Sequence, residues 1–425
     1  MKRIIFPVLI CLFLLSFSGI SFATNGDNLM AIGPIARAMG GVGVAAPQDA
    51  ISAVFANPAA MCFGPYCPGT EVNFGGTLFM PKVDATVTTS DGNVISADSA
   101  RKVYAIPAIG LSVPITNNWR FGLAAYGVSG LGVDYRDTAL DTPPTFLPGS
   151  GGTFPLVQGA YTQLQVMKFS PSISYQVNNN LSLGLGVHID YSNLDLRNGS
   201  SSNYGFGAQL GGIYKASDMI TLGVTYITPQ GVDHQNVVGT PEGSRDLKLQ
   251  SPQQVGVGIS VEPIKNTLLV EVNGRWINWG AATGYSDFDW KDQWVFALGV
   301  QYKPTKQLAL RAGYNYANNP VREHENFAGF NGTQNPPTTF VQGIPFPTYY
   351  YETFRIIGFP AVAEQHISFG IGYELSNKFA LNAGYTHAFE HSISESGTTP
   401  TSPVPVSLKS TLSEDSIEFG ITWRF

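Results

Sequence analysis

The side chains that could carry catalysis are few and scattered along the chain. None of the six histidines lies in an H-E-x-x-H zinc motif, and no serine lies in a G-x-S-x-G nucleophile elbow. A Ser–His pair formed across two strands stays open, but the sequence singles out no such pair. We therefore assign no catalytic residue, no metal ligand and no cofactor. The histidines are His188, His234, His324, His366, His387 and His391.

Cysteine chemistry is confined to one short stretch, where Cys62 and Cys67 are separated by Phe63-Gly64-Pro65-Tyr66. In an oxidising compartment, two cysteines at this spacing favour a disulfide that closes a small loop. No histidine lies nearby in the sequence, which disfavours a metal site. The remaining cysteine, Cys11, lies in a leader that we expect to be removed.

Charged side chains that could meet a ligand lie further along, in segments of alternating polarity. The alternation turns five of them inward. One interpretation is structural pairing inside the fold. The other is contact between an arginine and a carboxylate ligand, because the guanidinium fork matches carboxylate geometry. These residues are Glu271, Arg275, Arg311, Glu374 and Arg424.

The N-terminus has the order of a secretory signal peptide. Lys2 and Arg3 precede an apolar run from Ile4 to Phe17, and Ser21-Phe22-Ala23 forms a small-x-small cleavage site. A membrane anchor is the alternative, but the run is short for a span of about 20 apolar residues. We expect residues 1–23 to be removed by cleavage after Ala23.

The composition favours a membrane barrel over a soluble domain. Hydrophobic residues make up 44% of the chain, charged residues only 13%, and there are 47 glycines. Soluble domains are about one quarter charged, and no second stretch is long and apolar enough for a spanning helix. Loss of Lys2 and Arg3 lowers the 24 basic residues by two, to 22, against 30 acidic residues, a net charge of −8. This balance disfavours nucleic acid as a partner.

Beyond Thr70 the chain alternates with a period of two residues. In the last segment Ile417, Phe419 and Ile421 alternate with Ser416, Glu418 and Gly420. Successive side chains of a strand point to opposite faces, so one face suits lipid and the other a polar lumen. The terminal Phe425 resembles the C-terminal recognition residue of barrels inserted by the outer-membrane assembly machinery.

This pattern predicts fourteen antiparallel strands between residues 71 and 425. Six predicted turns are short and the other connections are mostly longer, an asymmetry typical of outer-membrane barrels. Closure into a barrel also removes the exposed edges of so large a sheet. The strands are expected to begin near Glu71, Lys102, Trp119, Tyr161, Asn180, Asn203, Met219, Leu247, Asn266, Gln293, Gln307, Glu364, Phe379 and Glu414.

Residues 24–70 do not alternate, and we call this segment the plug. It is rich in Ala and Gly, and its Ile, Val, Met and Phe content argues against a disordered leader. A short helix is expected over 49–56, ending at Asn57, because the residue before a proline avoids the helical region. These apolar residues would be buried inside a fourteen-stranded barrel.

The plug resembles the N-terminal hatch of the FadL/TodX family of outer-membrane transporters for hydrophobic compounds. The resemblance lies in the stretch Arg37-Ala38-Met39-Gly40-Gly41-Val42-Gly43, in Asp49 and in Asn57-Pro58-Ala59. Fourteen strands and the terminal Phe425 extend it over the whole mature chain. It implies an all-β, 14-stranded antiparallel transmembrane β-barrel, plugged by a small N-terminal helical hatch, in the outer membrane of a Gram-negative bacterium.

The resemblance also implies a passive route for fatty acids or hydrocarbons. Ligand would enter an apolar pocket beside the hatch and leave sideways through the wall at a kinked third strand, with Asn57-Pro58-Ala59 beside the kink. Glycines of the strand that begins at Trp119 suit such a kink. The gating residues are Asn57, Pro58, Ala59, Gly127 and Gly130. The ligand-binding residues are Leu29, Met30, Ile32, Tyr126, Val128, Phe354 and Ile356.

The connection 318–363 is long and rich in aromatic residues. Such loops are usually functional. Its rings either form an exposed surface that captures ligand or pack on one another as a lid. In the family a surface groove is usually built by the loops after the fifth and seventh strands. Here the loop after the fifth strand, 198–202, is short, which shifts the expected capture site to 318–363.

Two other classes compete with a transporter of hydrophobic compounds. One is an outer-membrane enzyme that modifies lipids, and the other is a general diffusion porin, which would gain nothing from an apolar plug. The expected partners are a hydrophobic small molecule, outer-membrane lipid and the assembly machinery. The chain is expected to act as a monomer, without nucleic acid.

Overall fold

The computed structural model describes residues 24–62, 69–90, 92–141, 156–157, 159–197, 199–240, 243–333 and 335–425. The expected signal peptide, residues 1–23, lies outside the described residues, as does Cys67. The Sγ of Cys62 lies 3.7 Å from the carbonyl oxygen of Asn118, and the disulfide with Cys67 stays a prediction. Within the described ranges, no helix has the length and apolar character needed to cross a membrane.

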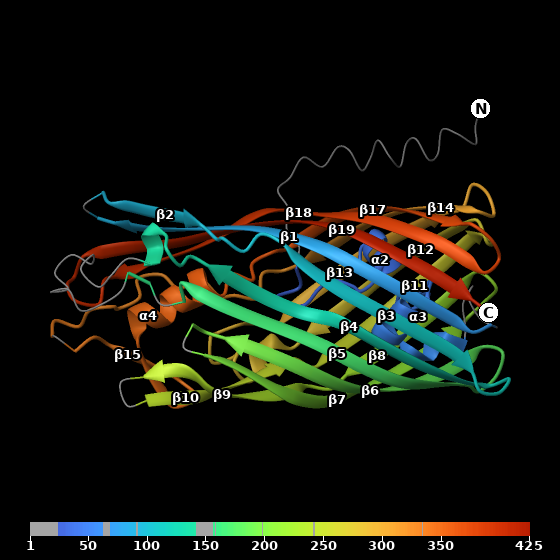
Figure 1. Cartoon of the computed structure of the whole chain (residues 1–425), viewed down its shortest axis with the longest axis horizontal. Coiled ribbons are helices and arrows are strands. Elements are labelled where there is room, and N and C mark those ends of the chain that lie inside the picture. The colour runs from blue at the N-terminus through green and yellow to red at the C-terminus, as the bar shows by residue number, and fades with distance from the viewer. Residues whose placement is uncertain are drawn as a thin grey trace.

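One closed antiparallel sheet dominates the molecule (Figure 1). It has fifteen strands, of which β2 pairs only with β1, and the pairing of β19 with β1 closes the other fourteen into a barrel. The predicted fourteen-stranded barrel is therefore confirmed. Its strands are β1 (Glu71–Thr89), β3 (Tyr104–Pro114), β4 (Trp119–Asp134), β5 (Tyr161–Gln176), β6 (Leu181–Asp195), β7 (Ser200–Lys215), β8 (Ile220–Ile227), β11 (Gln254–Ile264), β12 (Leu268–Ile277), β13 (Gln293–Tyr302), β14 (Leu308–Ala317), β17 (Gln365–Glu374), β18 (Phe379–Thr398) and β19 (Pro405–Arg424).

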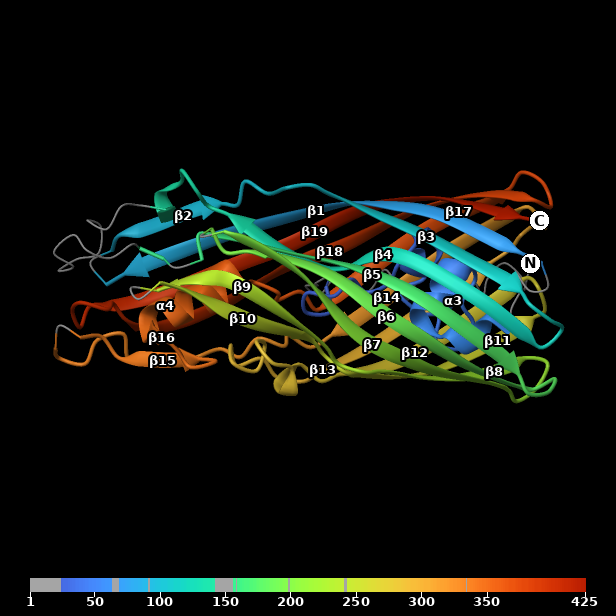
Figure 2. The ribbon, with the colours of Figure 1, turned by 60° about the horizontal axis from the view of Figure 1, so that its bottom comes forward.

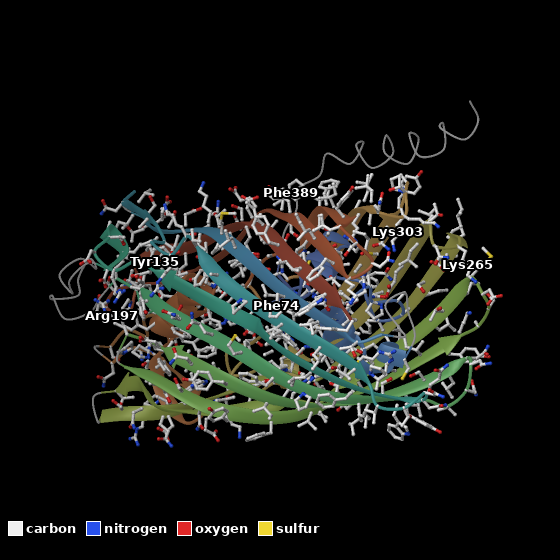
Figure 3. The ribbon with its side chains drawn as sticks, turned by 45° about the vertical axis from the view of Figure 1, so that its right-hand side comes forward. Phe74, Tyr135, Arg197, Lys265, Lys303 and Phe389 are labelled. Carbon is white, nitrogen blue, oxygen red and sulfur yellow. The ribbon has the colours of Figure 1, made fainter. Side chains whose placement is uncertain are left out.

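The two faces of the wall differ as the alternation predicts. On β19, Phe419 is 56% exposed and Ile421 46%, whereas the alternating Glu418 and Thr422 are buried. Figure 3 shows Phe74 among the side chains on the outer wall, between one end marked by Arg197 and the other marked by Lys265. An outer surface of this kind is suited to hydrocarbon, and the inner surface to polar contacts.

Two predicted strand starts are wrong. The eighth barrel strand begins at Gln254 and not near Leu247, because Leu247 belongs to the separate hairpin of β9 (Gln230–Thr240) and β10 (Gly243–Ser251). The last strand begins at Pro405 and not near Glu414. At the long-loop end β19 extends past the apolar band, and its outward residues Ser407 and Lys409 are polar, so the apolar alternation that marked the strands is absent there.

The plug lies inside the barrel, toward the end with the short turns, where α2 and α3 are enclosed by the strands (Figures 1 and 2). Its described part, residues 24–62, contains α2 (Pro34–Ala38), α3 (Ala50–Ala56) and the 3₁₀ helix η1 (Pro58–Cys62). Asp49 caps α3 by accepting from the backbone N–H of Ser52 at 2.8 Å, and extended Asn57 ends the helix. The predicted short helix is confirmed.

Glycines on the inner wall receive the backbone of the plug. A Cβ at Gly313 of β14 would overlap the backbone nitrogen of Gly40, and a Cβ at Gly184 of β6 would overlap that of Ala59. A Cβ at Gly223 of β8 would overlap the carbonyl oxygen of Val44. The abundance of inward glycine therefore has a specific cause, since the wall and the plug touch through their backbones.

The aromatic loop 318–363, which we call the lid, packs on itself and on the rim. Tyr349 and Ile357 are fully buried and Phe354 is 7% exposed, while Phe340 remains 65% exposed. Of the two interpretations of this loop, self-packing is the one observed. The lid contains β15 (Thr338–Val341), β16 (Ile344–Pro347), α4 (Thr348–Thr353) and the π-helical turn η4 (Phe354–Gly358); the remaining elements are β2 (Val94–Asp98), η2 (Ala139–Asp141) and η3 (Trp279–Ala281).

Candidate functional site: two cavities beside the plug

The wall is interrupted between β3 and β4. Their hydrogen-bonded ladder runs from Pro114–Arg120 to Ala108–Tyr126 and stops there. In the described range 92–141, a backbone hydrogen bond between these segments reappears at Ala100 N–Asp134 O, 2.8 Å. Between these points β4 stays paired with β5, with a register shift between Gly127 and Ser129. This bulge bends β4 away from β3 and leaves a gap in the wall.

The start of the plug closes this gap from inside. The backbone N–H of Leu29 donates to the carbonyl of Val128 at 3.0 Å, and the N–H of Gly130 donates to the carbonyl of Asp27 at 3.3 Å. Asn28 and Ser129 thus form an isolated antiparallel bridge. The turn 25–28 takes over hydrogen-bonding groups of β4 that would otherwise face the gap.

The same turn is held on its other side by aromatic residues between β12 and β13. The hydroxyl of Tyr285 donates to the carboxylate of Asp27, and the ring of Trp279 packs against that of Tyr285 at a tilt of 55°, with ring centroids 4.6 Å apart. Gly26 has φ +68°, and a Cβ there would lie 2.8 Å from Cζ2 of Trp279. Only glycine meets both demands at this position. Burial raises the pKa of Asp27 to about 6.

A cavity of about 420 Å³, which we call the lateral cavity, lies where the ladder between β3 and β4 stops. Its lining includes inward residues such as Phe79 and Leu164 and outward residues such as Val103, which is 63% exposed. Gly127 and Gly130 also line it. Ligand cavities in proteins are about 300–1,000 Å³ and mostly apolar, so this space has the size and character of a ligand site.

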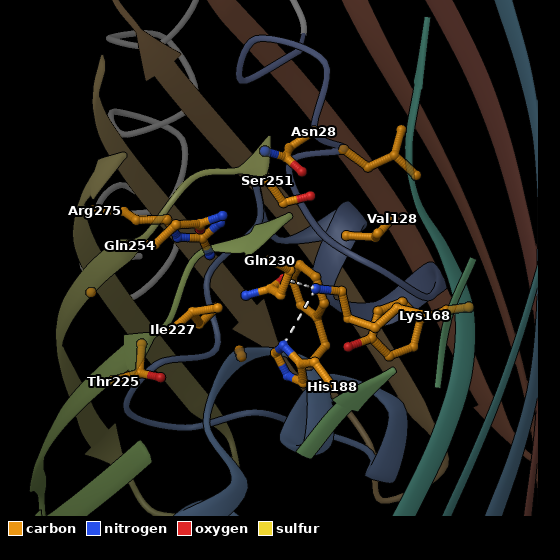
Figure 4. Close-up of a pocket in the computed structure, with 15 residues that line it drawn as sticks. Asn28, Val128, Lys168, His188, Thr225, Ile227, Gln230, Ser251, Gln254 and Arg275 are labelled. Carbon is orange, nitrogen blue, oxygen red and sulfur yellow. Dashed lines mark hydrogen bonds between the residues drawn. The ribbon is translucent and has the colours of Figure 1, made fainter. Parts of the chain in front are cut away.

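A second, interior cavity lies between the plug and the far wall (Figure 4). Its volume is about 30 Å³, enough for a water molecule but not for a ligand. The ammonium of Lys168 donates to Gln230 at 2.7 Å, lies 3.3 Å from Nδ1 of His188, and pairs with Asp190 at 3.3 Å. Leu29 lines both cavities and separates them.

Arg275 of β12 differs from the other inward charges. Its side chain lines the interior cavity, and it has no hydrogen-bond or ion-pair partner among the described residues. Arg424 pairs with Glu71 and Glu374 at 2.9 and 2.8 Å, and Arg311 bonds to two amides. Structural pairing therefore accounts for the other predicted inward charges, and Arg275 stays available for an anion.

The structure brings together only part of the predicted ligand set. Leu29, Tyr126 and Val128 line the interior cavity. Met30 and Ile32 are buried in the packing of the plug and line neither cavity. Phe354 and Ile356 belong to the lid, where Phe354 lines a separate space of about 20 Å³.

The predicted gating set divides in two. Gly127 and Gly130 lie at the gap, but the Asn57-Pro58-Ala59 stretch lies against other strands. The Asn57 side chain donates to Val44 of the plug at 2.8 Å and to the carbonyls of Gly212 on β7 and Val224 on β8, each at 3.2 Å. The structure does not bring it beside the kink, and its contacts are those of an anchor.

Two carboxylates of the wall hold the rest of the plug. Glu418 accepts from Nε of Arg37 at 2.7 Å, and both side chains are almost completely buried. Glu271 accepts from the backbone N–H groups of Gly43, Ala45 and Ala46 at 2.8–3.2 Å. Successive N–H groups of this kind form a concave anion site. The plug is thus attached along its middle, while residues 24–29 depend on the turn at the gap.

One group of side chains, two from the lid and one from β18, has the donor set of a metal site. Ligand atoms of His324, Glu352 and Glu395 all lie within 4.8 Å of one another. However, Nη1 of Arg355 already lies 2.6 Å from Glu352 and 2.7 Å from Glu395. This guanidinium supplies the positive charge that a metal would bring, so we assign the cluster to fastening the lid. Hydrogen bonding to Glu352 raises the pKa of His324.

Sequence reasoning missed Glu414 and Lys168, which line the lateral and the interior cavity. The signal for Glu414 was present, since it stands an even number of residues from the inward Glu418 on β19. Lys168 has no comparable sequence signal, because its role in the cavity depends on side chains that β6 and β9 place around it.

The comparisons with known proteins agree with this architecture. A family model described as "outer membrane protein transport protein (OMPP1/FadL/TodX)" matches residues 22–209 and 191–328. The comparison with curated proteins gave no match.

Solved structures show the same fold. The Pseudomonas putida toluene transporter TodX has a TM-score of 0.65 at 17% identity, over 93% of this chain and 99% of that one. A Pseudomonas aeruginosa FadL homologue has 0.66 at 16%, over 95% and 100%. The Ralstonia pickettii toluene transporter TbuX has 0.62 at 17%, over 93% and 99%. Since the family model covers more than half of the sequence, the chain belongs to the OMPP1/FadL/TodX family of outer-membrane transport proteins.

Proposed function

We propose that this protein passively carries hydrophobic small molecules, hydrocarbons or fatty acids, across the outer membrane and releases them sideways through the lateral cavity. The observation that carries the proposal is a cavity of about 420 Å³ at the break between β3 and β4, lined by residues of both faces of the wall and bordered by a short turn of the plug. The titles of TodX and TbuX as toluene transporters, and of CymD as a monoaromatic hydrocarbon channel, support the ligand class.

The physics of the ligand favours a sideways exit. Each buried CH₂ is worth about 0.8 kcal/mol relative to water, so an apolar solute gains nothing from a watery axial pore. A lateral opening delivers it to the hydrocarbon of the bilayer without passing through water. Because lipid surrounds the outward residues Val103 and Met167 of the cavity, ligand can leave directly into it.

The plug argues against a general diffusion porin. Residues 24–62 are almost entirely buried within the barrel, and their backbone lies against wall glycines such as Gly184 and Gly313. A filled lumen of this kind opposes the passage of sugars or ions. A Ser–His pair does form between β6 and β9, where Oγ of Ser192 lies 3.2 Å from Nε2 of His234. Both side chains are buried and line neither the lateral nor the interior cavity, so we propose transport in place of an enzyme.

The gate in this proposal is the turn 25–28 together with Leu29, which follows it. Two backbone hydrogen bonds join it to β4, those of Leu29 to Val128 and of Gly130 to Asp27. A hydrogen bond contributes about 1 kcal/mol net, so thermal motion can release both. Displacement of Leu29 would join the two cavities, because this side chain lines each of them. For a fatty acid, Arg275 would then offer a cation to the carboxylate in the interior cavity.

A reversible cross-link tests the gate. Asn28 and Ser129 are bridge partners, and facing residues of an antiparallel bridge lie about 4.5–5.5 Å apart, which permits a disulfide. Oxidised Asn28→Cys/Ser129→Cys protein in proteoliposomes should lose toluene and oleate uptake, and reduction should restore it. A pair in the wall ladder, Val300→Cys/Ala312→Cys, should transport equally in both states.

Two further measurements separate the competing functions. Liposome swelling with sugars should be absent, since rapid swelling would indicate a porin. Leu29→Ala should raise uptake and Leu29→Trp should lower it. The same truncation at Leu269, which lies in a different cluster of the plug and wall, should leave uptake unchanged. Equal uptake by the oxidised and the reduced Asn28→Cys/Ser129→Cys protein would refute the gate.

A further inference from the structure

One acidic side chain of the lateral cavity lacks a hydrogen-bond or ion-pair partner among the described residues. Glu414 of β19 points inward, is 6% exposed and lines this cavity. It has no hydrogen-bond or ion-pair partner among the residues that the structure describes. Glu418, four residues further along the same face, accepts from both Arg37 and Ser416. The two acids share a strand, but only Glu418 has side-chain partners.

The surroundings of Glu414 offer no donor. Its backbone partners across the sheet are Pro81 on β1 and Ala388 on β18. Pro81 has no N–H to give, and neither neighbour carries a polar side chain. The next inward residue on β19, Leu412, is also apolar and lines the same cavity.

Two donors elsewhere in the cavity are turned to other acceptors. Arg101 donates to Gln163 at 2.9 Å, and the hydroxyl of Tyr104 donates to the carbonyl of Gly132 at 3.4 Å. A buried polar group without a partner is costly to the fold. The Glu414 carboxyl has no such partner and faces the lateral cavity of about 420 Å³. A molecule that enters this cavity can therefore supply the missing hydrogen bond.

We propose that Glu414 accepts a hydrogen bond from the polar end of the transported molecule. The lateral cavity then selects hydrophobic molecules that end in a donor group, an alcohol or an amine, over plain hydrocarbons of the same size. This inference rests on the proposed function and names the ligand class of its exit site. The ring or chain of the ligand contacts apolar residues such as Phe79 and Leu164, and its donor group reaches Glu414.

Three probes of nearly equal size test the proposal: toluene, benzyl alcohol and benzylamine. Binding of each to the purified full-length protein is measured by equilibrium dialysis and divided by binding to empty detergent micelles. The variants are Glu414→Leu, which removes the acceptor, and Glu414→Gln, which keeps an acceptor oxygen but no charge. Glu262→Gln at the short-turn rim, half-buried and outside the lateral cavity, is the matched control.

Loss of one hydrogen bond in a buried site lowers binding by about tenfold. Glu414→Leu should therefore lower the ratio of benzyl alcohol to toluene by about this factor, and should not weaken toluene itself. Glu414→Gln should retain the alcohol and lose the amine. The control should match the wild type for all three probes. Because Glu414→Leu removes a buried unpaired acid, its barrel should fold at least as well as the wild type.

An alcohol-to-toluene ratio that Glu414→Leu leaves unchanged overturns the proposal. That result is expected if a cation of the protein itself holds the carboxyl, such as the α-ammonium of a mature chain that begins at Thr24, which lines the same cavity. Uptake separates this inference from the proposed function. Wild-type proteoliposomes that take up none of the three probes refute transport, while the binding ratio still decides the role of Glu414.

Discussion

Removal of the Arg37 charge should loosen the plug without breaking the barrel. Nε of Arg37 lies 2.7 Å from Glu418 and Nη2 lies 2.7 Å from Ser416, and the side chains of Arg37 and Glu418 are 4% and 0% exposed. In Arg37→Met the volume is nearly kept, but Glu418 becomes a buried charge without a counter-charge, with hydrogen bonds only from Ser416 and Thr386. Loss of one member of a buried ion pair costs about 3–5 kcal/mol.

This cost falls on the plug, because the ladders of the wall do not involve Arg37. Since each 1.4 kcal/mol is tenfold in an equilibrium constant, the population with a displaced plug should rise by roughly 10²–10³ or more. In planar lipid bilayers the wild type should be nearly silent. Arg37→Met should show frequent openings of ion conductance, and protease should cleave residues 24–62 faster.

A double variant separates the orphaned charge from lost packing. Replacing a buried ion pair by apolar residues of similar volume is often neutral. In Arg37→Met/Glu418→Leu the frequency of conductance openings should therefore fall most of the way back to the wild-type level. This is expected although the double variant lacks more native contacts than the single variant. An Arg37→Met protein as closed as the wild type, or a double variant as leaky as the single one, would refute the reasoning.

Three other outcomes follow from the turn at the gap and from the lid. Gly26→Ala should raise toluene uptake, because strain in the turn weakens its closed position. The new Cβ would lie 2.8 Å from Trp279 at a positive φ, and such strain costs about 1–3 kcal/mol. Unchanged uptake would contradict this. Burial raises the pKa of Asp27 from 3.8 to about 6, so the folded turn favours the protonated acid and loses up to about 3 kcal/mol of stability as pH rises through 6. Uptake should thus be faster at pH 7.5 than at pH 5, and Asp27→Asn should remove the difference. The pKa of His324 is raised above 6.5, chiefly by its hydrogen bond to Glu352, so its contribution to the lid is complete below pH 6.5 and is lost as pH rises through the raised value. Hydrogen exchange in 348–358 should accelerate over that range in the wild type but not in His324→Gln.

The barrel could be predicted because lipid imposes a simple rule on the sequence. A residue of a spanning strand must be apolar if it points outward, so the parity of Phe419 and Ile421 fixes the face of every residue between them. The rule holds only within the bilayer. On β19 the outward residues Ser407 and Lys409 lie beyond the apolar band, and the start of this strand could not be found from its polarity.

The site was less predictable because it depends on which side chains the plug places opposite the wall. Tyr126 and Val128 of the predicted ligand set do line the interior cavity, and the glycines at 127 and 130 do lie at the bulge of β4. The position of Asn57 depends on the path of the whole plug and could not be derived from its own neighbours. The fit between Asn57 and the strands β7 and β8 is invisible until the fold is known.

The close fit between wall and plug constrains the order in which this molecule can be assembled. The seam that closes the cylinder joins β1 to β19, the first barrel strand to the last. Residues 24–62 precede β1, yet their backbone occupies niches at glycines of β6, β8 and β14. A finished cylinder leaves no room to thread that chain into those niches. Residues 24–62 must therefore be in place before β19 pairs with β1, and the wall closes around them.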